Sequence, residues 1–391
     1  MHVRRIGVVG IAVLVVIGFV SPLAAAGTVG TTGTTGTTGA AGAGPASTAD
    51  ATEPTCSFPV TVTDDTDTEI ELESPPDSVV TLNPSAAQTM WEIGAEDQVV
   101  GTTQHAENLE GAEDRTSVST ESETIEHEII VDLDPDLVLA PSSDYVSEDE
   151  EVETLREADV PVYYFDSAES IDDVRDRTHT IGSLVGECDG AAETVDWMDE
   201  ELAIVEDALE GEERPDVLYT FFGFTAGEET FIHELIEAGG GTNVAAEAGI
   251  TEYQQPTDEM ILEQDPEWLI LNTNSPDVPD APAYDSTTAV EQNQTVTIEV
   301  NHLNRPGPRV VHAVTAMAET FHPEAYAEAV SDAETESETV ADADNETETE
   351  ADSDSTDDSD GIPGFGILPA GAALAALLTL LAVIRHGDRN L

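Results

Sequence analysis

The chain has 391 residues, with 83 acidic side chains against 11 basic ones, all of them arginine, and a formal net charge of −72 at pH 7. This balance excludes nucleic-acid binding, because nothing in the chain would neutralise a phosphate backbone. Molar salt shortens the Debye length to about 3 Å and screens the self-repulsion. Since 39% of the residues are hydrophobic and occur in ordered patterns, we expect a folded halophilic protein and not a disordered acidic chain.

The first segment, residues 1–26, has the pattern of a secretory signal peptide. Arg4 and Arg5 precede an apolar run, and small residues ending at Ala26 offer a cleavage site. The paired arginines leave twin-arginine export open beside Sec export. Residues 27–55 are rich in Thr and Gly and are predicted to form a linker.

Strands and helices alternate over residues 56–168, which we predict to be an N-terminal α/β lobe. Buried strands are expected at 78–82 and 137–140. Ser85 follows the first of them and is predicted to be the N-cap of a helix. The alternating order implies a sheet rich in parallel strands and covered on both faces.

Residues 169–212 are predicted to form a connecting helix. Apolar residues recur there at helical spacing without a proline, although Gly182, Gly186 and Gly190 leave a break open. The strand–helix pattern returns over 213–330, which we predict to be a C-terminal α/β lobe. The expected fold class is therefore α/β, with two Rossmann-like lobes joined by a single long connecting helix.

The C-terminal end carries two further signals. Residues 331–361 consist almost entirely of Asp, Glu, Ser, Thr and Ala, and we predict an extended acidic stalk. Residues 362–391 contain Pro363, Gly364 and Phe365, then an apolar stretch and arginines. This tail resembles the archaeal PGF-C-terminal sorting signal, which implies a sorting protease and a lipid anchor. A plain transmembrane helix is the alternative, and either predicts an exported protein anchored to the outer face of the cytoplasmic membrane.

Two kinds of covalent modification are suggested by short patterns. Asn293 and Asn345 begin candidate glycosylation sequons, which also arise by chance. Cys56 and Cys188 lie in a region expected to be exported and are candidates for a disulfide. Two separately buried thiols are the alternative.

One pattern occurs in both predicted lobes. Residues 128–140 match residues 259–271: each begins with a glutamate near the start of a helix, passes through Asp-Pro and ends in a buried strand. A common βα solution found twice is the alternative to an internal repeat.

Several motifs follow one another along the folded region. They are Val80-Thr-Leu-Asn-Pro-Ser-Ala-Ala87, Asp134-Pro-Asp-Leu-Val-Leu-Ala140, Leu155-Arg-Glu-Ala-Asp-Val-Pro-Val162, Thr225-Ala-Gly-Glu228, Ala238-Gly-Gly-Gly-Thr-Asn-Val-Ala245 and Pro306-Gly-Pro-Arg-Val-Val311. In this order, residues 78–326 resemble the substrate-binding proteins of ABC importers for vitamin B12 and ferric siderophores. The resemblance implies a corrinoid or ferric-chelate ligand between two lobes, with an ABC permease and its ATPase as partners. We also expect a monomeric receptor without a cofactor of its own.

The resemblance also gives a role to Glu128 and Glu259, one in each lobe. In the family such glutamates dock onto arginines of the permease. Exposed ion pairs contribute only about 0–1 kcal/mol, so docking in molar salt would need direct, bidentate contact. The alternative is that both carboxylates complement a helix dipole.

Ligand contacts are expected at the carboxyl ends of strands, where open α/β sheets bind ligands. The candidates are Asn83, Ser85, His105, Ser142, Phe221, Phe224, His302 and Arg305. His105 stands where vitamin B12-binding relatives have a Tyr, whereas Phe224 matches an aromatic position. His105 and His302 are candidates to contact a metal-bearing ligand, and Arg305 to meet an anionic group. The alternatives are surface histidines and an arginine that neutralises neighbouring acids.

Other classes of function find less support. The sequence has no Gly-x-Ser-x-Gly elbow, phosphate loop or His-Glu-x-x-His pattern, so we do not expect an enzyme. A zinc, manganese or haem receptor of the same two-lobe plan is one alternative. A surface-structural or adhesive protein is another, favoured by the stalk and anchor but not by the βα core.

Overall fold

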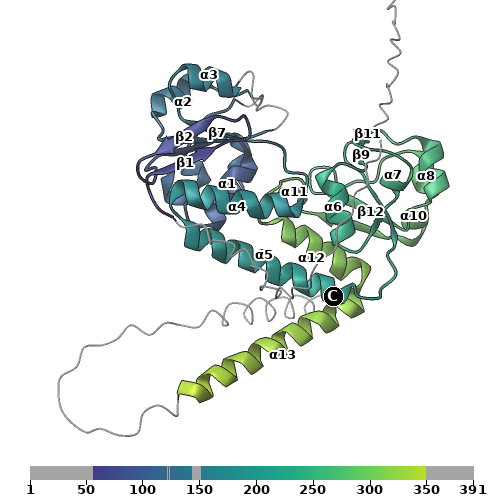
Figure 1. The fold of residues 1–391 in the computed structure, drawn as a ribbon. Helices are drawn as coiled ribbons and strands as arrows, with labels where there is room; N and C mark the ends of the chain where they lie inside the picture. Colours follow the sequence, from purple (N-terminus) through teal and green to yellow (C-terminus); the bar gives the residue numbers. More distant parts are fainter. Residues whose placement is uncertain (1–55, 121, 123, 143–150, 349–391) are drawn as a thin grey trace, which may run out of the picture. The chain divides into compact units, whose positions relative to one another are not determined.

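The computed structural model describes residues 56–348 except 121, 123 and 143–150 (Figure 1). The predicted signal peptide (1–26), linker (27–55) and sorting signal (362–391) lie outside these residues. None of the helices in the described ranges combines the length and apolar character needed to cross a membrane.

The N-terminal lobe is built on a parallel sheet with strand order β5-β4-β3-β6-β7. Its strands are β3 (Val79–Thr81), β4 (Val99–Thr102), β5 (Thr116–Ser117), β6 (Leu137–Pro141) and β7 (Val162–Phe165). Its helices are α1 (Pro84–Glu92), α2 (His127–Leu133) and α3 (Glu153–Glu157), with the short 3-10 helices η1 (Glu96–Gln98), η2 (Gln104–Ala106) and η3 (Ala112–Asp114).

Both faces of this sheet are covered, as the run of apolar residues in β6 requires. Leu137 and Leu139 face the core that α1 helps to form, whereas Val138 and Ala140 face α2 and α3 (Figure 1). Helix α1 begins two residues earlier than predicted, at Pro84. Its N-cap is Asn83, whose side chain accepts a hydrogen bond from the backbone amide of Ser85, so the predicted Ser85 cap is wrong. Pro84 follows the cap because the missing N–H of proline costs nothing at the first helical position.

An antiparallel hairpin precedes the sheet, formed by β1 (Val60–Thr63) and β2 (Glu69–Leu72). Asp64 fixes it to the lobe: the buried carboxylate accepts the hydroxyl of Thr66 and the amides of Thr68 and Tyr164, and pairs with Arg156. Burial raises the pKa of Asp64, but these hydrogen bonds outweigh it, and the pKa lies below its usual value.

The predicted connecting helix is two helices, α4 (Ile171–Val185) and α5 (Cys188–Ala208). Gly186 ends α4 in the left-handed conformation (φ 85°), and its amide donates to the carbonyl of Gly182. The next glycine permits close packing, because a Cβ at Gly190 would lie 2.1 Å from the carbonyl oxygen of Ile93. The prediction of a single connecting helix over residues 169–212 is therefore wrong: the helix is interrupted at Gly186, one of the glycines at which a break was left open.

Cys56 and Cys188 are joined by a disulfide with an S–S distance of 2.03 Å. The bond ties the segment before β1 to the first residue of α5. The described residues include no free cysteine.

The C-terminal lobe repeats the plan with a parallel sheet of order β10-β8-β12-β13. Its strands are β8 (Asp216–Tyr219), β10 (Thr242–Asn243), β12 (Trp268–Asn272) and β13 (Thr295–Ile298), and a separate antiparallel pair consists of β9 (Thr225–Ala226) and β11 (Tyr253–Gln254). Its helices are α6 (Phe231–Ala238), α7 (Val244–Glu247), α8 (Asp258–Gln264), α9 (Pro282–Asp285), α10 (Thr288–Gln292), α11 (Val300–Leu303) and α12 (Val310–Phe321). One face packs against α5, α6 and α12, and the other against α7 to α10.

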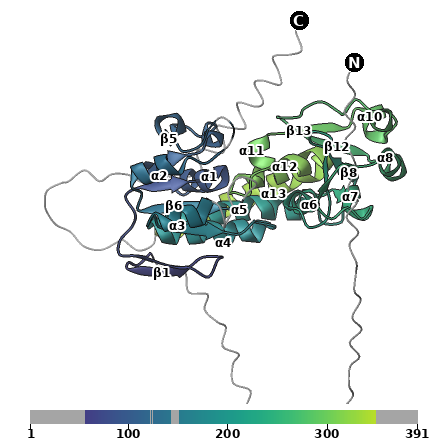
Figure 2. The same cartoon turned by 90° about the horizontal axis from the view of Figure 1, so that it is seen from above.

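A last helix, α13 (Pro323–Glu348), corrects the prediction of an extended stalk beginning at residue 331. The helix starts against α5 and α12, where Tyr326 packs on the core of the lobe (Figure 2). Its alanines and glutamates are strong helix formers, so the helix continues through residues that composition alone assigned to an extended chain.

Candidate functional site

Aromatic side chains gather on the C-terminal lobe at the carboxyl end of β8. Phe222, Tyr253 and Phe224 are 66%, 53% and 42% exposed, and Phe221 is half-buried beside them. The rings of Phe221 and Phe222 lie 4.5 Å apart, and Tyr253 is placed by the pairing of β11 with β9. We call these four residues the aromatic platform.

A strained turn presents the most exposed member of the platform. The backbones of Phe221 and Phe224 exchange two hydrogen bonds of 2.9 Å across a two-residue turn. Phe222 has φ 48° and Gly223 has φ 82°. Positive φ at both central positions favours Asn-Gly, and a bulky phenylalanine at the first is an outlier. Such strain persists where the surrounding structure or a function demands it.

A buried polar network fixes the floor beneath the platform. The ring of Tyr219 stacks at 6.4 Å from that of Phe221, and its hydroxyl accepts the side-chain amides of Asn272 (3.1 Å) and Asn304 (2.9 Å). The side-chain amide of Asn272 also donates to the side-chain oxygen (Oδ1) of Asn304 at 2.9 Å. Burial raises the pKa of Tyr219, and the nearby Tyr253 adds to the shift, so the phenol stays neutral. These hydrogen bonds connect the carboxyl ends of β8 and β12, and the aromatic platform packs on the residues that they hold in place.

The two lobes also meet through side chains of α1. Gln88 is fully buried; its amide donates to the carbonyl of Asn301 (3.2 Å), and its carbonyl accepts the amide of Arg309 (3.1 Å). The guanidinium of Arg309 donates to the carboxylate of Glu92 at 2.6 Å. The predicted ligand residue Arg305 reaches across as well: its guanidinium donates to Asn108 of the N-terminal lobe at 2.7 Å.

The structure places the predicted His302 beside another histidine, His312. The rings of His302 and His312 lie 4.9 Å apart, and His312 also packs on Trp197. Burial, and then the neighbouring His312, lower the pKa of His302; burial lowers the pKa of His312 against the opposing effect of Glu92. Both imidazoles are therefore neutral at pH 7. Within the described ranges, no group of three or more His, Cys, Asp or Glu side chains gathers to hold a metal ion.

The predicted ligand residues of the N-terminal lobe follow the carboxyl ends of its strands. Asn83 and Ser85 hydrogen-bond each other in the cap of α1, so their polar groups serve the helix. His105 lies half-buried in η2, after β4. Ser142 follows β6, and its amide donates to the carbonyl of Phe165 at 2.8 Å.

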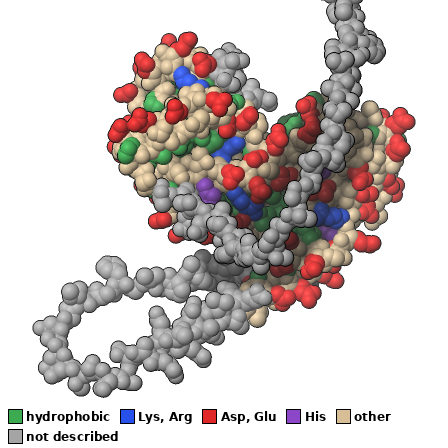
Figure 3. Space-filling view, viewed as in Figure 1, with side chains coloured by type: hydrophobic (Ala, Val, Ile, Leu, Met, Phe, Trp, Pro, Cys, Tyr) green, Lys and Arg blue, Asp and Glu red, His purple; other side chains and the backbone are tan. Residues whose placement is uncertain are grey.

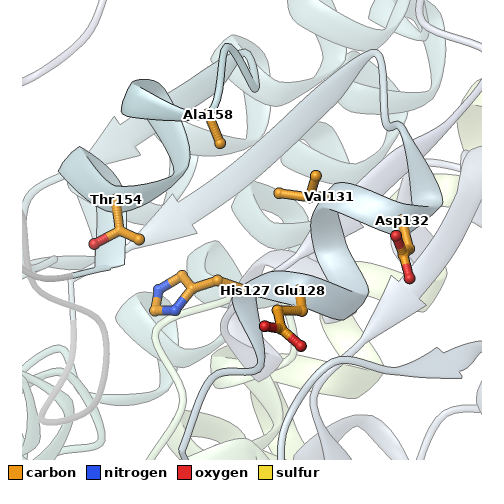
Figure 4. Close-up of a pocket in the computed structure, with 6 residues that line it drawn as sticks. All are labelled: His127, Glu128, Val131, Asp132, Thr154 and Ala158. Carbon is orange, nitrogen blue, oxygen red and sulfur yellow. The ribbon is translucent and has the colours of Figure 1, made fainter.

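The predicted docking glutamates lie exposed on two separate short helices. Glu128 lies in the first turn of α2, and Glu259 in the first turn of α8. Beside Glu128 a shallow pocket of about 300 Å³ opens between α2 and α3, lined by His127, Glu128, Val131, Asp132, Thr154 and Ala158 (Figure 4). Acidic side chains are spread widely over the visible surface and basic ones are few (Figure 3).

Sequence reasoning named Phe221 and Phe224 but missed Phe222 and Tyr253. The run Phe221-Phe222-Gly223-Phe224 contained a usable signal, because three aromatic residues around a glycine mark an exposed turn. Tyr253 had no such signal, since only the pairing of β11 with β9 brings it there.

Comparison with known proteins agrees with this architecture. Residues 79–300 match the family described as periplasmic binding protein. A cobalamin-binding protein of Halobacterium salinarum is 45% identical over 334 residues, covering 82% of this chain and 87% of that protein. An uncharacterized ABC transporter substrate-binding lipoprotein of Bacillus subtilis is 25% identical, covering 69% of this chain and 88% of that protein.

Solved structures of the same fold include a periplasmic heme-binding protein of Roseiflexus in apo form. It has a TM-score of 0.57 and 22% identity, and the match covers 64% of this chain and 99% of that chain. An ABC-type Fe3+-hydroxamate transport protein of Saccharomonospora viridis has a TM-score of 0.55 and 26% identity, with 68% and 99% covered. The family match spans most of both lobes, and this chain belongs to the periplasmic binding protein family.

Proposed function

We propose that this protein is the substrate-binding receptor of an ABC importer and that its substrate is a corrinoid, with cobalamin as the first candidate. The observation that carries the proposal is the 45% identity to the cobalamin-binding protein of Halobacterium salinarum, which extends over 82% of this chain. The receptor has no catalytic step in this proposal.

The aromatic platform supports a ligand with a large, flat, apolar face. Phe222 and Tyr253 are more than half exposed, which is costly in water unless a partner covers them. A corrin ring offers a broad hydrocarbon surface, and aromatic side chains supply large apolar contact areas to cover it. His105 and Ser142, at strand ends of the other lobe, are proposed to contact the amide-bearing periphery of the ring. Arg305, steered by Asn108, is proposed to meet the phosphate of cobalamin.

The proposal also covers the contact with the permease and the cellular location of the receptor. We place the permease contact at Glu128 and Glu259, one exposed carboxylate in each lobe. The patterns of residues 1–26 and 362–391 support export followed by anchoring at the outer face of the cytoplasmic membrane, through a lipid or a C-terminal helix.

The test is a calorimetric titration of the full chain, purified in detergent and molar KCl, with cobalamin, cobinamide, haem and a ferric hydroxamate. We expect saturable, sub-micromolar binding of cobalamin and cobinamide, and binding of the iron compounds at least a hundredfold weaker. Tighter binding of haem or the hydroxamate would reassign the substrate. A folded protein that binds none of the four would refute the receptor proposal.

A further inference from the structure

The sheet of the C-terminal lobe ends in a strand with a free edge. β13 lies at one end of the sheet and pairs in parallel with β12 (Figure 2). The carbonyls of Gln294 and Ile298 accept backbone amides from the β12 side, at 3.1 and 3.0 Å. Because successive backbone groups of a strand alternate in direction, the N–H and C=O groups of Thr295 and Thr297 turn away from β12. Within the described ranges, no other segment forms backbone hydrogen bonds with them.

The other edges of the two parallel sheets are short or occupied, as far as the structure describes them. β5 and β10 have two residues each. At β7, the amide of Tyr164 donates to the carboxylate of Asp64 at 3.1 Å, and its carbonyl accepts the amide of Asp65 at 3.3 Å. Short length and a covering segment are two of the usual protections of an edge strand. β13 has four residues and neither protection.

The segment that contains β13 also lacks charge. Residues 292–298, Gln-Asn-Gln-Thr-Val-Thr-Ile, contain no charged side chain, no proline and no glycine, in a chain with 83 acidic residues. Val296 and Ile298 pack into the core of the lobe, whereas Thr295 and Thr297 are exposed. An uncharged segment of this length, rich in β-branched residues and open at an edge, is prone to pair with another copy of itself.

The N-glycosylation pattern lies at the start of this edge. Asn293, Gln294 and Thr295 form the sequence Asn-x-Thr. Asn293 ends α10 in the left-handed conformation (φ 58°), which asparagine tolerates, and the side chains of Asn293 and Thr295 are both exposed. Neither side chain forms a hydrogen bond with another of the described residues. A transferase can therefore reach both side chains without unfolding the lobe.

We propose that Asn293 is an N-glycosylation site and that its glycan shields the free edge of β13 from another strand; the inference rests on the export that the proposed function requires. The donor is an oligosaccharide joined through phosphate to a membrane lipid. The side-chain nitrogen of Asn293 (Nδ2) forms a bond to the anomeric carbon of the sugar, and the bond from that carbon to the phosphate oxygen breaks. The lipid phosphate leaves with the bonding electrons, and Nδ2 gives one of its two protons to a base of the transferase.

A glycan suits this edge because its effect does not depend on charge. The Debye length is about 3 Å in molar salt, so like charges placed on an edge would repel another strand only at contact. A bulky, hydrated oligosaccharide excludes an approaching strand by its volume. The four residues of β13 span about 13 Å, at about 3.3 Å per residue, and Asn293 lies two residues before the strand begins. A glycan of a few sugars is therefore long enough to cover the edge.

The test uses the full chain, exported by Halobacterium salinarum and recovered from the cell surface. Mass spectrometry of the peptide that contains Asn293, separated from the peptide that contains Asn345, is expected to find sugar in the wild type and in Thr295→Ser, which keeps the pattern. Thr295→Val and Asn293→Gly remove the pattern and should lose the sugar. Valine keeps the β-branched shape, and glycine tolerates φ 58°, so both variants should fold.

Sedimentation velocity in 3 M KCl measures the shielding on the same proteins. The wild type and Thr295→Ser should be monomeric. The two variants without sugar should form dimers or larger species at the same concentration. Thr297→Val is the matched control, because it places a valine on the same edge and leaves the pattern intact, so it should stay glycosylated and monomeric.

Three outcomes would overturn the inference. An unmodified Asn293 in the surface protein would refute the site. A glycan whose removal leaves both variants monomeric would refute the shielding, and association of Thr297→Val with its glycan intact would assign the effect to valine and refute it as well. Calorimetry with cobalamin on the same proteins should give one affinity for all of them. A wild type that carries the glycan but does not bind cobalamin would count against the proposed function alone.

Discussion

Replacing Phe222 with asparagine is expected to stabilise the fold and weaken ligand binding at the same time. The backbone of Phe222 has φ 48°, and the left-handed conformation costs a bulky residue about 1–2 kcal/mol. Asparagine tolerates that conformation and, before Gly223, forms the pair that such two-residue turns favour. We therefore expect Phe222→Asn to raise the free energy of unfolding by about 1 kcal/mol.

The loss of binding follows from the exposed ring. A phenylalanine side chain has roughly 200 Å² of surface, and 66% of Phe222 is open to solvent. If cobalamin covers half of the open part, about 70 Å² at about 25 cal/mol per Å² is worth roughly 1.7 kcal/mol. The dissociation constant should therefore rise somewhat more than tenfold, since 1.4 kcal/mol corresponds to tenfold.

Urea unfolding in 3 M KCl and calorimetry with cobalamin measure the two effects on the same protein. Glu229→Asn is the matched control, because Glu229 also has a positive φ (62°) and is exposed in the same lobe. The control should gain stability and keep its affinity for cobalamin. A Phe222→Asn protein that binds cobalamin as tightly as the wild type would refute the platform, and one that is less stable would refute the argument from backbone strain.

Two further predictions concern the attachment of the N-terminal segment. Asp64→Asn should lower the free energy of unfolding at pH 7 by about 2–3 kcal/mol, because it breaks a buried pair with Arg156, which is itself only slightly exposed. The pKa of Asp64 is lowered in the folded state, so its contribution to stability is complete above the unfolded-state pKa and is lost as the pH falls through the folded-state pKa. The wild type should therefore lose more stability than the variant on acidification below about pH 4. Parallel pH profiles from urea unfolding would contradict this expectation. The double variant Cys56→Ser with Cys188→Ser should have a free energy of unfolding lower by up to about 5 kcal/mol on the chain-entropy model, because the disulfide closes a loop of 132 residues. Equal urea midpoints for the variant and the oxidised wild type would count against the disulfide.

The alternation of strands and helices could be predicted because it is written in local periodicity. The apolar run of β6 (Leu137–Pro141) and the matching β12 (Trp268–Asn272) both follow an Asp-Pro pair, and each lies inside a parallel sheet. Apolar residues repeating every 2 or 3.6 positions depend only on neighbours within a few residues, so strands and helices can be recognised from the sequence without the tertiary structure. The same kind of local pattern matched residues 128–140 with residues 259–271.

The sequence by itself thus determined the α/β class, the two lobes and the family resemblance, whereas the tertiary structure decided how distant residues meet. Gly186, Gly182 and Gly190 could each have broken the connecting helix, but only Gly186 takes the left-handed conformation, whereas Gly190 stays within α5 and packs against Ile93. Helix α13 forms because its first turns pack on α5 and α12, which composition does not record. Tyr253 lies opposite Ala226, close to the Phe221–Phe224 turn, only through the pairing of β11 with β9. Such contacts depend on packing between segments far apart in the chain, and local propensity carries no information about which segments will pack together.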